Sequence, residues 1–231
     1  MKEEALSVAD PCGACIGIPI WKRLLDVACI LVALPVLVPL LGVIALGIKI
    51  ISRGPVLFKQ ERIGLRGARF TCFKFRTMKV DAAVVAHQNY LKDLMQSQVP
   101  MTKMDLIGDP RLFPLASALR ATGLDELPQV LNVLRGEMSL VGPRPCLPYE
   151  YEDYLPNQKR RFDTLPGITG LWQVSGKNKT TFKEMIDLDI SYVLNRSVWL
   201  DLAIMLRTLP VLAVQFKEIL KRRMRRHRQS S

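Results

Sequence analysis

The chain has 231 residues, 49% of them hydrophobic, and a formal net charge of +12. A chain of this length can bury a sizeable core as one large domain or two small ones. Its five scattered cysteines exclude a disulfide framework, and its basic excess favours an anionic partner, whether a nucleic acid, an acidic lipid surface or a phosphorylated substrate.

The first 20 residues show little hydrophobic periodicity and no signal-peptide layout, so we expect a loose N-terminal arm. Cys12 and Cys15 form one CxxC pair within it. A structural zinc site needs four ligands and the sequence has no second pair, so we do not expect zinc.

An uncharged run of 22 residues extends over 27–48. At about 1.5 Å of rise per residue it is long enough to cross a hydrocarbon core of roughly 30 Å. However, Pro35 and Pro39 lie inside it, and an internal proline removes a hydrogen bond and bends or breaks a helix.

Basic residues flank this run on both sides: Lys22, Arg23, Lys49 and Arg53. The positive-inside rule keeps both ends on the cytoplasmic side. We therefore expect a re-entrant membrane helix hairpin over 21–52, broken at Pro39. A bent spanning helix is the alternative, and a buried core helix is less favoured because core helices are seldom apolar all round.

Residues 56–62 and 68–75 are rich in strand-forming side chains and flank a glycine-containing turn, which predicts a β-hairpin. Residues 80–98 have a helical pattern. Residues 99–115 contain three prolines, which indicates a loop.

Residues 120–129 contain two adjacent carboxylates, Asp125 and Glu126, behind Thr122 as a candidate N-cap. This pattern predicts the start of a helix. Taken alone, the carboxylates only complement the helix dipole, although a helix N-terminus also suits phosphate.

Four further elements are expected in the second half of the chain. They are a rigid proline turn over 139–145, a polar helix over 149–161, a glycine-rich loop over 165–176 and a helix over 182–195.

The last apolar segment, 198–216, contains Asp201 and Arg207, which a spanning helix would accommodate at high cost. We therefore expect a helix on the membrane interface. Residues 217–231 form a polybasic tail with a net charge of +6 (seven Lys and Arg against one Glu). Such a tail attracts anionic lipid at about 1 kcal/mol per basic side chain. A solvated or RNA-binding tail is the alternative.

The expected fold class is α+β and mostly helical. The N-terminal arm covers 1–20, the re-entrant hairpin 21–52, a main domain with the small β-hairpin and interfacial amphipathic helices 53–216, and the polybasic tail 217–231.

Several residues together suggest a site that handles phosphate. Lys74 and Arg76 share one strand face, because strand side chains alternate with period two. Arg144 lies between Pro143 and Pro145, whose fixed backbone angles aim its guanidinium for bidentate recognition.

Arg120 lies five residues before Asp125. Neighbouring carboxylates can hold Mg²⁺ together with substrate phosphates, and a carboxylate can also attack phosphorus directly. A diphosphate substrate would explain why acidic and basic side chains are combined here. The glycines of 165–176 would let the backbone approach such a ligand closely.

The chain resembles the bacterial sugar transferases, the monotopic phosphoglycosyl transferases that load a sugar 1-phosphate from a nucleotide-sugar onto undecaprenyl phosphate. The resemblance extends from about Trp21 to Phe216. It rests on an ordered set of motifs: Lys22-Arg23 with Asp26, then residues 54–60, 74–78, 109–111, 124–129, 132–136, 138–145 and 166–170.

The resemblance implies catalysis on the cytoplasmic face of a bacterial inner membrane, as the first membrane step of polysaccharide or glycoconjugate synthesis. The partners would be a UDP-sugar, undecaprenyl phosphate and anionic lipid. We expect no nucleic acid, and a homo-oligomer is compatible with the family.

The family's Asp-Glu dyad falls on Asp125 and Glu126. Asp125 would attack the phosphate attached to the sugar, release UMP and hold Mg²⁺. Glu126 would assist at the metal or as a base. Arg120 and Arg144 match arginines that contact phosphate and the nucleotide.

The sequence departs from the family at three points. Val38 replaces the usual serine before the breaking proline, and Phe113 to Ser117 lack two cations that are common there, which bears on donor affinity or specificity. The chain also starts nearly at the hairpin, as in the minimal form of the family.

A non-catalytic membrane adaptor with a basic lipid- or RNA-binding tail is the alternative function. It requires no Asp-Glu dyad, so UMP release from UDP-sugars separates the two hypotheses.

Overall fold

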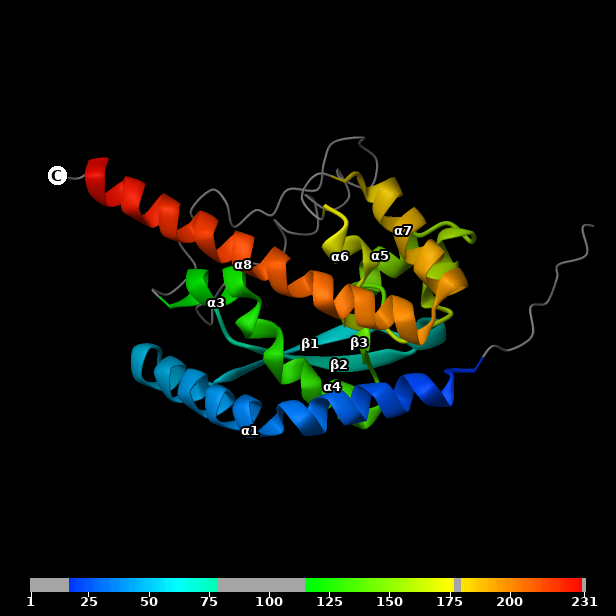
Figure 1. Cartoon of the computed structure of the whole chain (residues 1–231), viewed down its shortest axis with the longest axis horizontal. Helices are drawn as coiled ribbons and strands as arrows, with labels where there is room; N and C mark the ends of the chain where they lie inside the picture. Colours follow the sequence, from blue (N-terminus) through cyan, green and yellow to red (C-terminus); the bar gives the residue numbers. More distant parts are fainter. Residues whose placement is uncertain (1–16, 79–114, 177–179, 230–231) are drawn as a thin grey trace, which may run out of the picture.

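A computed structural model describes residues 17–78, 115–176 and 180–229 (Figure 1). Two expectations fall outside these ranges. They are the helix over 80–98 and nearly all of the loop over 99–115. Cys12 and Cys15 also lie outside the described residues.

Helix α1 (Ile20–Ile51) is one continuous helix of 32 residues, with Pro35 and Pro39 inside it. The expected interruption of the helix at Pro39 is therefore absent. A proline removes only its own N–H from the helical bonding, and tertiary packing against one helix face can sustain the rest.

That packed face repeats every four residues, at Lys22, Asp26 and Ile30 in the first half and at Ile44 and Ile48 in the second. Helix α1 curves gently along one side of the molecule (Figure 1). The whole apolar helix thus lies against the rest of the protein instead of leaving it.

Strands β1 (Leu57–Ile63) and β2 (Arg69–Phe75) pair antiparallel, which confirms the predicted hairpin. A short 3₁₀ helix, η1 (Leu65–Gly67), forms the turn. The register pairs Phe58 with Lys74 and Arg62 with Phe70. Directly paired residues share one face, so Lys74 and Arg62 project from the same side of the hairpin.

Helix α3 (Ala116–Thr122), the 3₁₀ helix η3 (Leu124–Gln129) and helix α4 (Val130–Arg135) follow one another directly. Thr122 ends α3 and its hydroxyl donates to the Ala118 carbonyl, so it is not the N-cap that we expected. Gly123 makes the junction with φ of 71°, a conformation that costs glycine nothing.

Two short strands, β3 (Ser139–Val141) and β4 (Gly167–Thr169), pair in parallel. We had expected only a turn and a glycine-rich loop there. The backbones of the two strands approach so closely that a Cβ atom on Gly167 would collide with the backbone nitrogen of Gly142. These glycines therefore serve backbone packing, although Gly167 also borders the cleft described below.

The expected helix over 149–161 is two helices, α5 (Pro148–Asp153) and η4 (Gln158–Phe162). Pro156 lies between them, and a proline disfavours helical conformation in the residue before it. After the short helix α6 (Leu171–Val174), helix α7 (Phe182–Asn195) confirms the prediction for that segment and begins with a capping box of Thr181 and Glu184.

Helix α8 (Val198–Gln229) continues through the basic segment that we had separated as a tail. Asp201, in its first turn, is 1% exposed and pairs with Lys22 of α1 at 2.6 Å. Its charge therefore lies inside the protein and does not face lipid.

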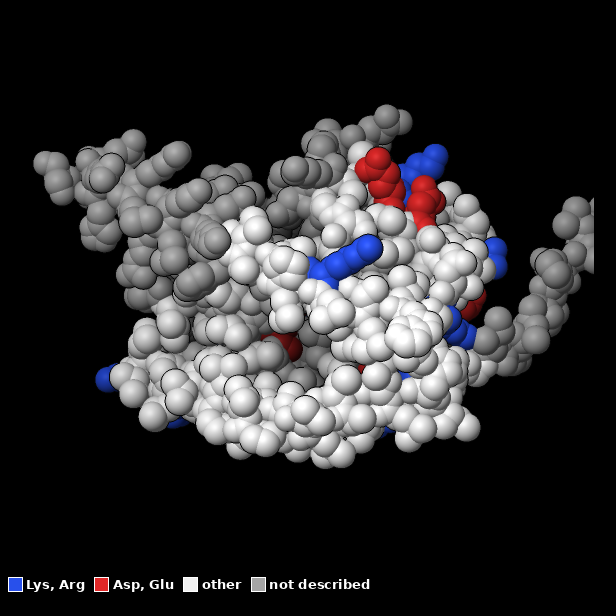
Figure 2. All heavy atoms as spheres, in the orientation of Figure 1, with Lys and Arg blue, Asp and Glu red and all other residues white. Residues whose placement is uncertain are grey.

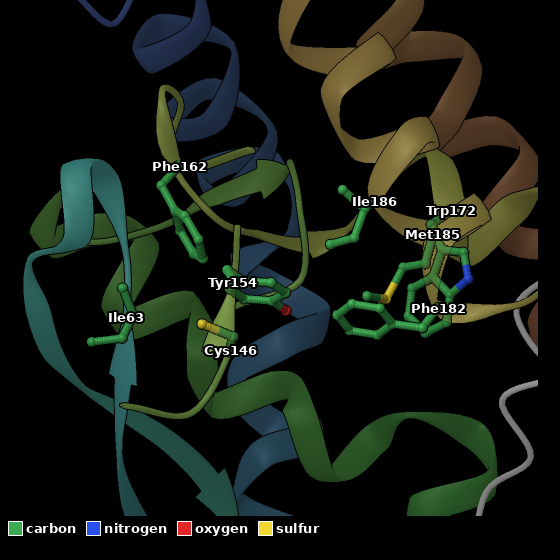
Figure 3. Packing of buried hydrophobic residues seen from close by; sticks show 8 residues of the cluster. All are labelled: Ile63, Cys146, Tyr154, Phe162, Trp172, Phe182, Met185 and Ile186. Atoms are coloured by element: carbon green, nitrogen blue, oxygen red, sulfur yellow. The ribbon is translucent and has the colours of Figure 1, made fainter. Parts of the chain in front are cut away.

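The largest buried aromatic cluster joins α5, η4, α6 and α7. Figure 3 shows Tyr154 beside Phe182, and their rings stack with centroids 5.6 Å apart. This cluster packs the end of β1 and the segment 146–162 against α6 and α7.

Candidate functional site

A cleft with about 240 Å³ of empty space lies where β2, η3, β4 and the segment after β3 meet. Its lining combines cationic, acidic, amide and apolar groups: Arg62, Lys74, Glu126, Gln129, Arg144, Pro145, Gly167, Ile168 and Gln173. Four residues predicted from the sequence are therefore brought together there, namely Lys74, Glu126, Arg144 and Pro145.

Glu126 is the centre of the charge arrangement. Lys74 Nζ lies 2.9 Å from Glu126 Oε1, and Arg144 Nη1 lies 3.5 Å from the same oxygen. The three side chains are 16% to 35% exposed, so a ligand can still reach them. One carboxylate thus holds two cations in place.

Arg62 is a cleft residue that the sequence analysis missed. It is 8% exposed, and it donates to the Pro145 carbonyl at 3.1 Å and to Gln60 Oε1 at 2.6 Å. Burial and the neighbouring Arg144 lower its pKa, but an arginine remains protonated at neutral pH. The strand register places Arg62 on the same face as Lys74. If that register had been known, the alternation of side chains along the strands would have identified Arg62.

The cleft therefore has three cations and one carboxylate, which gives a net charge of +2. Such a surplus in a partly enclosed space attracts a ligand with at least two negative charges. A diphosphate meets that requirement.

Backbone contacts fix the position of Arg144. The Pro143 carbonyl accepts from Gly167 N at 2.9 Å, and the Arg144 carbonyl accepts from Arg161 Nη2 at 3.0 Å. Arg62 holds the next carbonyl, as described above. The two prolines and these bonds pre-organise the Arg144 guanidinium.

Asn132 of α4 ties the hairpin to the segment that carries Glu126. Its side chain is fully buried, accepts from Phe73 N at 3.1 Å and donates to the Thr71 carbonyl at 2.7 Å. The bonded residues, Thr71 and Phe73, flank Cys72, and Phe73 directly precedes Lys74. Asn132 is a positioning residue that the sequence analysis did not identify.

Other predicted site residues lie outside this cleft. Arg76 is 5% exposed and donates to the Ser52 and Arg53 carbonyls, so it closes the C-terminal end of α1. Arg120 is in the last turn of α3, and Asp125 precedes Glu126 on η3. Pro39 lies within α1.

The buried cysteines are poor nucleophiles. Burial raises the pKa of Cys72, and it raises that of Cys146 to about 12. A thiol attacks as its thiolate.

A family model described as "Bacterial sugar transferase" matches residues 18–215. The chain belongs to the bacterial sugar transferase family. The match runs from the start of α1 to the middle of α8. Every residue that lines the cleft lies within it.

Curated relatives of this family member differ in length. The chain is 46% identical over 160 residues to galactosyl transferase CpsE of Streptococcus agalactiae, covering 68% of this chain and 34% of CpsE. It is 37% identical over 195 residues to the exopolysaccharide production protein ExoY of Sinorhizobium fredii, covering 84% and 86%.

A third relative, from Caulobacter vibrioides, is named UDP-glucose:undecaprenyl-phosphate glucose-1-phosphate transferase. It is 40% identical over 206 residues, which cover 85% of this chain and 71% of the relative. The chain thus spans about one third of CpsE but most of ExoY.

Among the described residues, this sugar transferase has no group of three or more His, Cys, Asp and Glu side chains placed to hold a metal. Asp125 and Glu126 carry adjacent carboxylates, the type of ligand that Mg²⁺ commonly takes together with water and substrate phosphates. Glu126 contacts two cations.

Proposed function

We propose that this protein transfers a sugar 1-phosphate from a UDP-sugar to undecaprenyl phosphate and releases UMP. The observation that carries the proposal is the array of Lys74, Glu126 and Arg144, in which Glu126 directly follows Asp125 on η3. The names of relatives from Caulobacter vibrioides and Salmonella typhimurium, which act on undecaprenyl phosphate, support it.

The cations of the cleft bind the diphosphate of the donor. Phosphoryl transfer depends mainly on alignment and on neutralisation of the phosphate charge. Lys74 contributes a point charge, whereas Arg62 and Arg144 contribute planar forks that suit two phosphate oxygens. Before the donor binds, Lys74 and Arg144 form ion pairs with the Glu126 carboxylate.

The reaction then proceeds in two displacements. A carboxylate oxygen of Asp125 forms a bond to the phosphorus attached to the sugar, and the bond from that phosphorus to UMP breaks, so UMP leaves with the electron pair. An oxygen of undecaprenyl phosphate next attacks the same phosphorus and displaces the Asp125 carboxylate. The products are undecaprenyl-diphosphate-sugar and free enzyme.

Mg²⁺, held by Asp125 and the donor phosphates, would neutralise charge on the diphosphate. Glu126 orients the cations and is the nearest candidate for a base.

Helix α1 lies in one leaflet, with both ends on the cytoplasmic face. Both ends are tied to the same domain by polar groups. Lys22 pairs with Asp201 near the N-terminal end, and Arg76 bonds the carbonyls at the C-terminal end. The outer face between them is apolar and exposed, as at Val32 and Val36.

In this proposal α1 is a curved helix held at both ends against the membrane, in place of the hairpin broken at Pro39 that we expected. Figure 2 shows that the face toward the viewer, where α1 and α8 lie, carries few charged side chains among the described residues. Trp199, Leu206 and Leu209 of α8 are exposed and would join α1 in the interface. The basic end of α8 would contact anionic headgroups.

The test is UMP release from a panel of UDP-sugars by the full chain in detergent or nanodiscs, with Mg²⁺ and undecaprenyl phosphate. We expect release with at least one donor and less than about one thousandth of it for Asp125→Asn, whose folding should change by about 1 kcal/mol or less. Near-wild-type turnover by Asp125→Asn would contradict the assignment of Asp125 as the nucleophile. Inactivity with every donor, together with salt-sensitive RNA binding, would favour the adaptor.

A further inference from the structure

Gln173 of α6 lines the cleft but has no role in the chemistry described above. Its side chain is 8% exposed, and its Oε1 atom is buried without a hydrogen-bond partner among the described residues. Buried polar groups are nearly always hydrogen-bonded, so an exception at a binding cleft points to a missing ligand.

The carbonyl lies next to Gly170. A Cβ atom on Gly170 would lie 2.8 Å from Gln173 Oε1. The terminal torsion of a glutamine is broad, so the amide can turn toward a ligand in the cleft without movement of the backbone.

The chemistry of the cleft restricts the ligand group. Arg62, Lys74 and Arg144 already supply donors for phosphate oxygens. The carbonyl of Gln173 needs a donor, and an ionised diphosphate has none. Within a UDP-sugar, the donors are the hydroxyls of the sugar, the hydroxyls of the ribose and the N–H of uracil.

The position of the cations separates the sugar from the nucleoside. The cleft opens to solvent, and its cations would hold the diphosphate, so the donor group next to the attacked phosphate lies against the cleft while the rest extends outward. The part next to the transferred phosphate is the sugar. Ile168, also in the lining, provides an apolar surface for the sugar ring.

We propose that the Gln173 side-chain carbonyl accepts a hydrogen bond from a hydroxyl of the transferred sugar and so contributes to donor choice. This inference rests on the proposed function and deepens it. Loss of one such bond should cost about 10- to 100-fold in kcat/KM, because the buried carbonyl is then left without a donor.

The experiment measures kcat/KM for UMP release with UDP-galactose or UDP-glucose, whichever the wild-type enzyme uses faster, and with its 2-, 3-, 4- and 6-deoxy analogues. The wild type should disfavour one deoxy donor by about 10- to 100-fold. Gln173→Leu should lose a similar factor on the parent sugar and discriminate against that analogue by less than about threefold. Gln173→Glu keeps an acceptor, so it should retain discrimination while its KM rises through repulsion of the diphosphate.

Gln158→Leu makes the same chemical change outside the cleft and should keep the wild-type ratio. The proposal would be overturned if Gln173→Leu lowered kcat/KM equally for all donors. It would also be overturned if Gln173→Leu kept the wild-type ratio of kcat/KM between the parent sugar and the disfavoured deoxy analogue. A donor built on 2′-deoxyuridine tests the ribose. If Gln173→Leu changes the ratio of kcat/KM only between the parent donor and this analogue, the partner is the ribose and the sugar assignment is wrong. A wild-type enzyme without UMP release would instead refute the proposed function, so the two failures are distinguishable.

Discussion

Two clusters of charged residues in this protein use the same kinds of side chain but differ in their access to water. At the junction of α1 and α8, Lys22 and Asp201 are 0% and 1% exposed, and Tyr192 bonds both of them. At the cleft, Lys74, Glu126 and Arg144 remain partly exposed.

The difference separates structure from chemistry. The buried cluster has a partner for each charge and no space for a ligand, so its energy contributes to the folded state and to the attachment of α1. The cleft cluster has more positive than negative charge and an open side. Its surplus is available for an anionic substrate.

Breaking the buried cluster should give the largest change in stability. Lys22→Ala leaves the Asp201 carboxylate buried without its cation, and we expect a loss of about 3–5 kcal/mol in the free energy of unfolding. Denaturant unfolding in detergent would measure it. Lys22→Ala with Asp201→Asn should recover part of the loss, and a double-variant loss equal to the sum of the two single-variant losses would show that the charges are not coupled.

Breaking the cleft cluster should change activity and leave stability nearly intact. Lys74→Met removes a cation from the diphosphate site, and we expect about a 100-fold loss of kcat/KM with a change of about 1 kcal/mol or less in unfolding. The two quantities should be measured on the same preparation. A large loss of stability with proportional loss of activity would place Lys74 with the structural cluster.

Removal of the metal should sharpen the same contrast. Chelation with EDTA should lower UMP release at least 100-fold and leave the unfolding transition within error, because no described cluster of side chains depends on a metal to fold. Added Mg²⁺ should restore the rate. Full activity after exhaustive chelation would contradict the metal assignment.

A milder change tests the geometry of the cleft. Arg144→Lys keeps the charge but loses the planar fork, so we expect a loss of about tenfold in kcat/KM, mostly through KM for the donor. An unchanged KM with a lower kcat would show that Arg144 acts mainly in the transition state.

The contrast also explains what the sequence could predict. The β-hairpin and α7 follow from patterns within about 15 residues, such as alternation and helical periodicity. The ordered set of motifs identified the family, and four of the nine cleft residues were predicted from the sequence.

Long-range pairing explains what was missed. The partner of Asp201 is Lys22, 179 positions earlier, and no local pattern connects them. Instead, we interpreted Lys22 as a flanking charge and Asp201 as an obstacle to membrane insertion. Arg76 similarly follows the strand period of Lys74 but turns to the chain just after α1, where the Ser52 and Arg53 carbonyls accept its hydrogen bonds.

The parallel pair of β3 and β4 was hidden because each strand has only three residues and glycine dominates its surroundings. Gln173 lay in a segment that we interpreted as a glycine-rich loop, so its side chain had no predicted orientation.

The central claim is that Asp125 becomes covalently linked to the sugar phosphate. The most direct measurement is mass spectrometry of the protein after incubation with a UDP-sugar and Mg²⁺ but without undecaprenyl phosphate. We predict a sugar-phosphate adduct on the peptide that contains Asp125, formed with release of UMP and removed when undecaprenyl phosphate is added. UMP release that requires both substrates together, with no adduct on that peptide, would contradict the account.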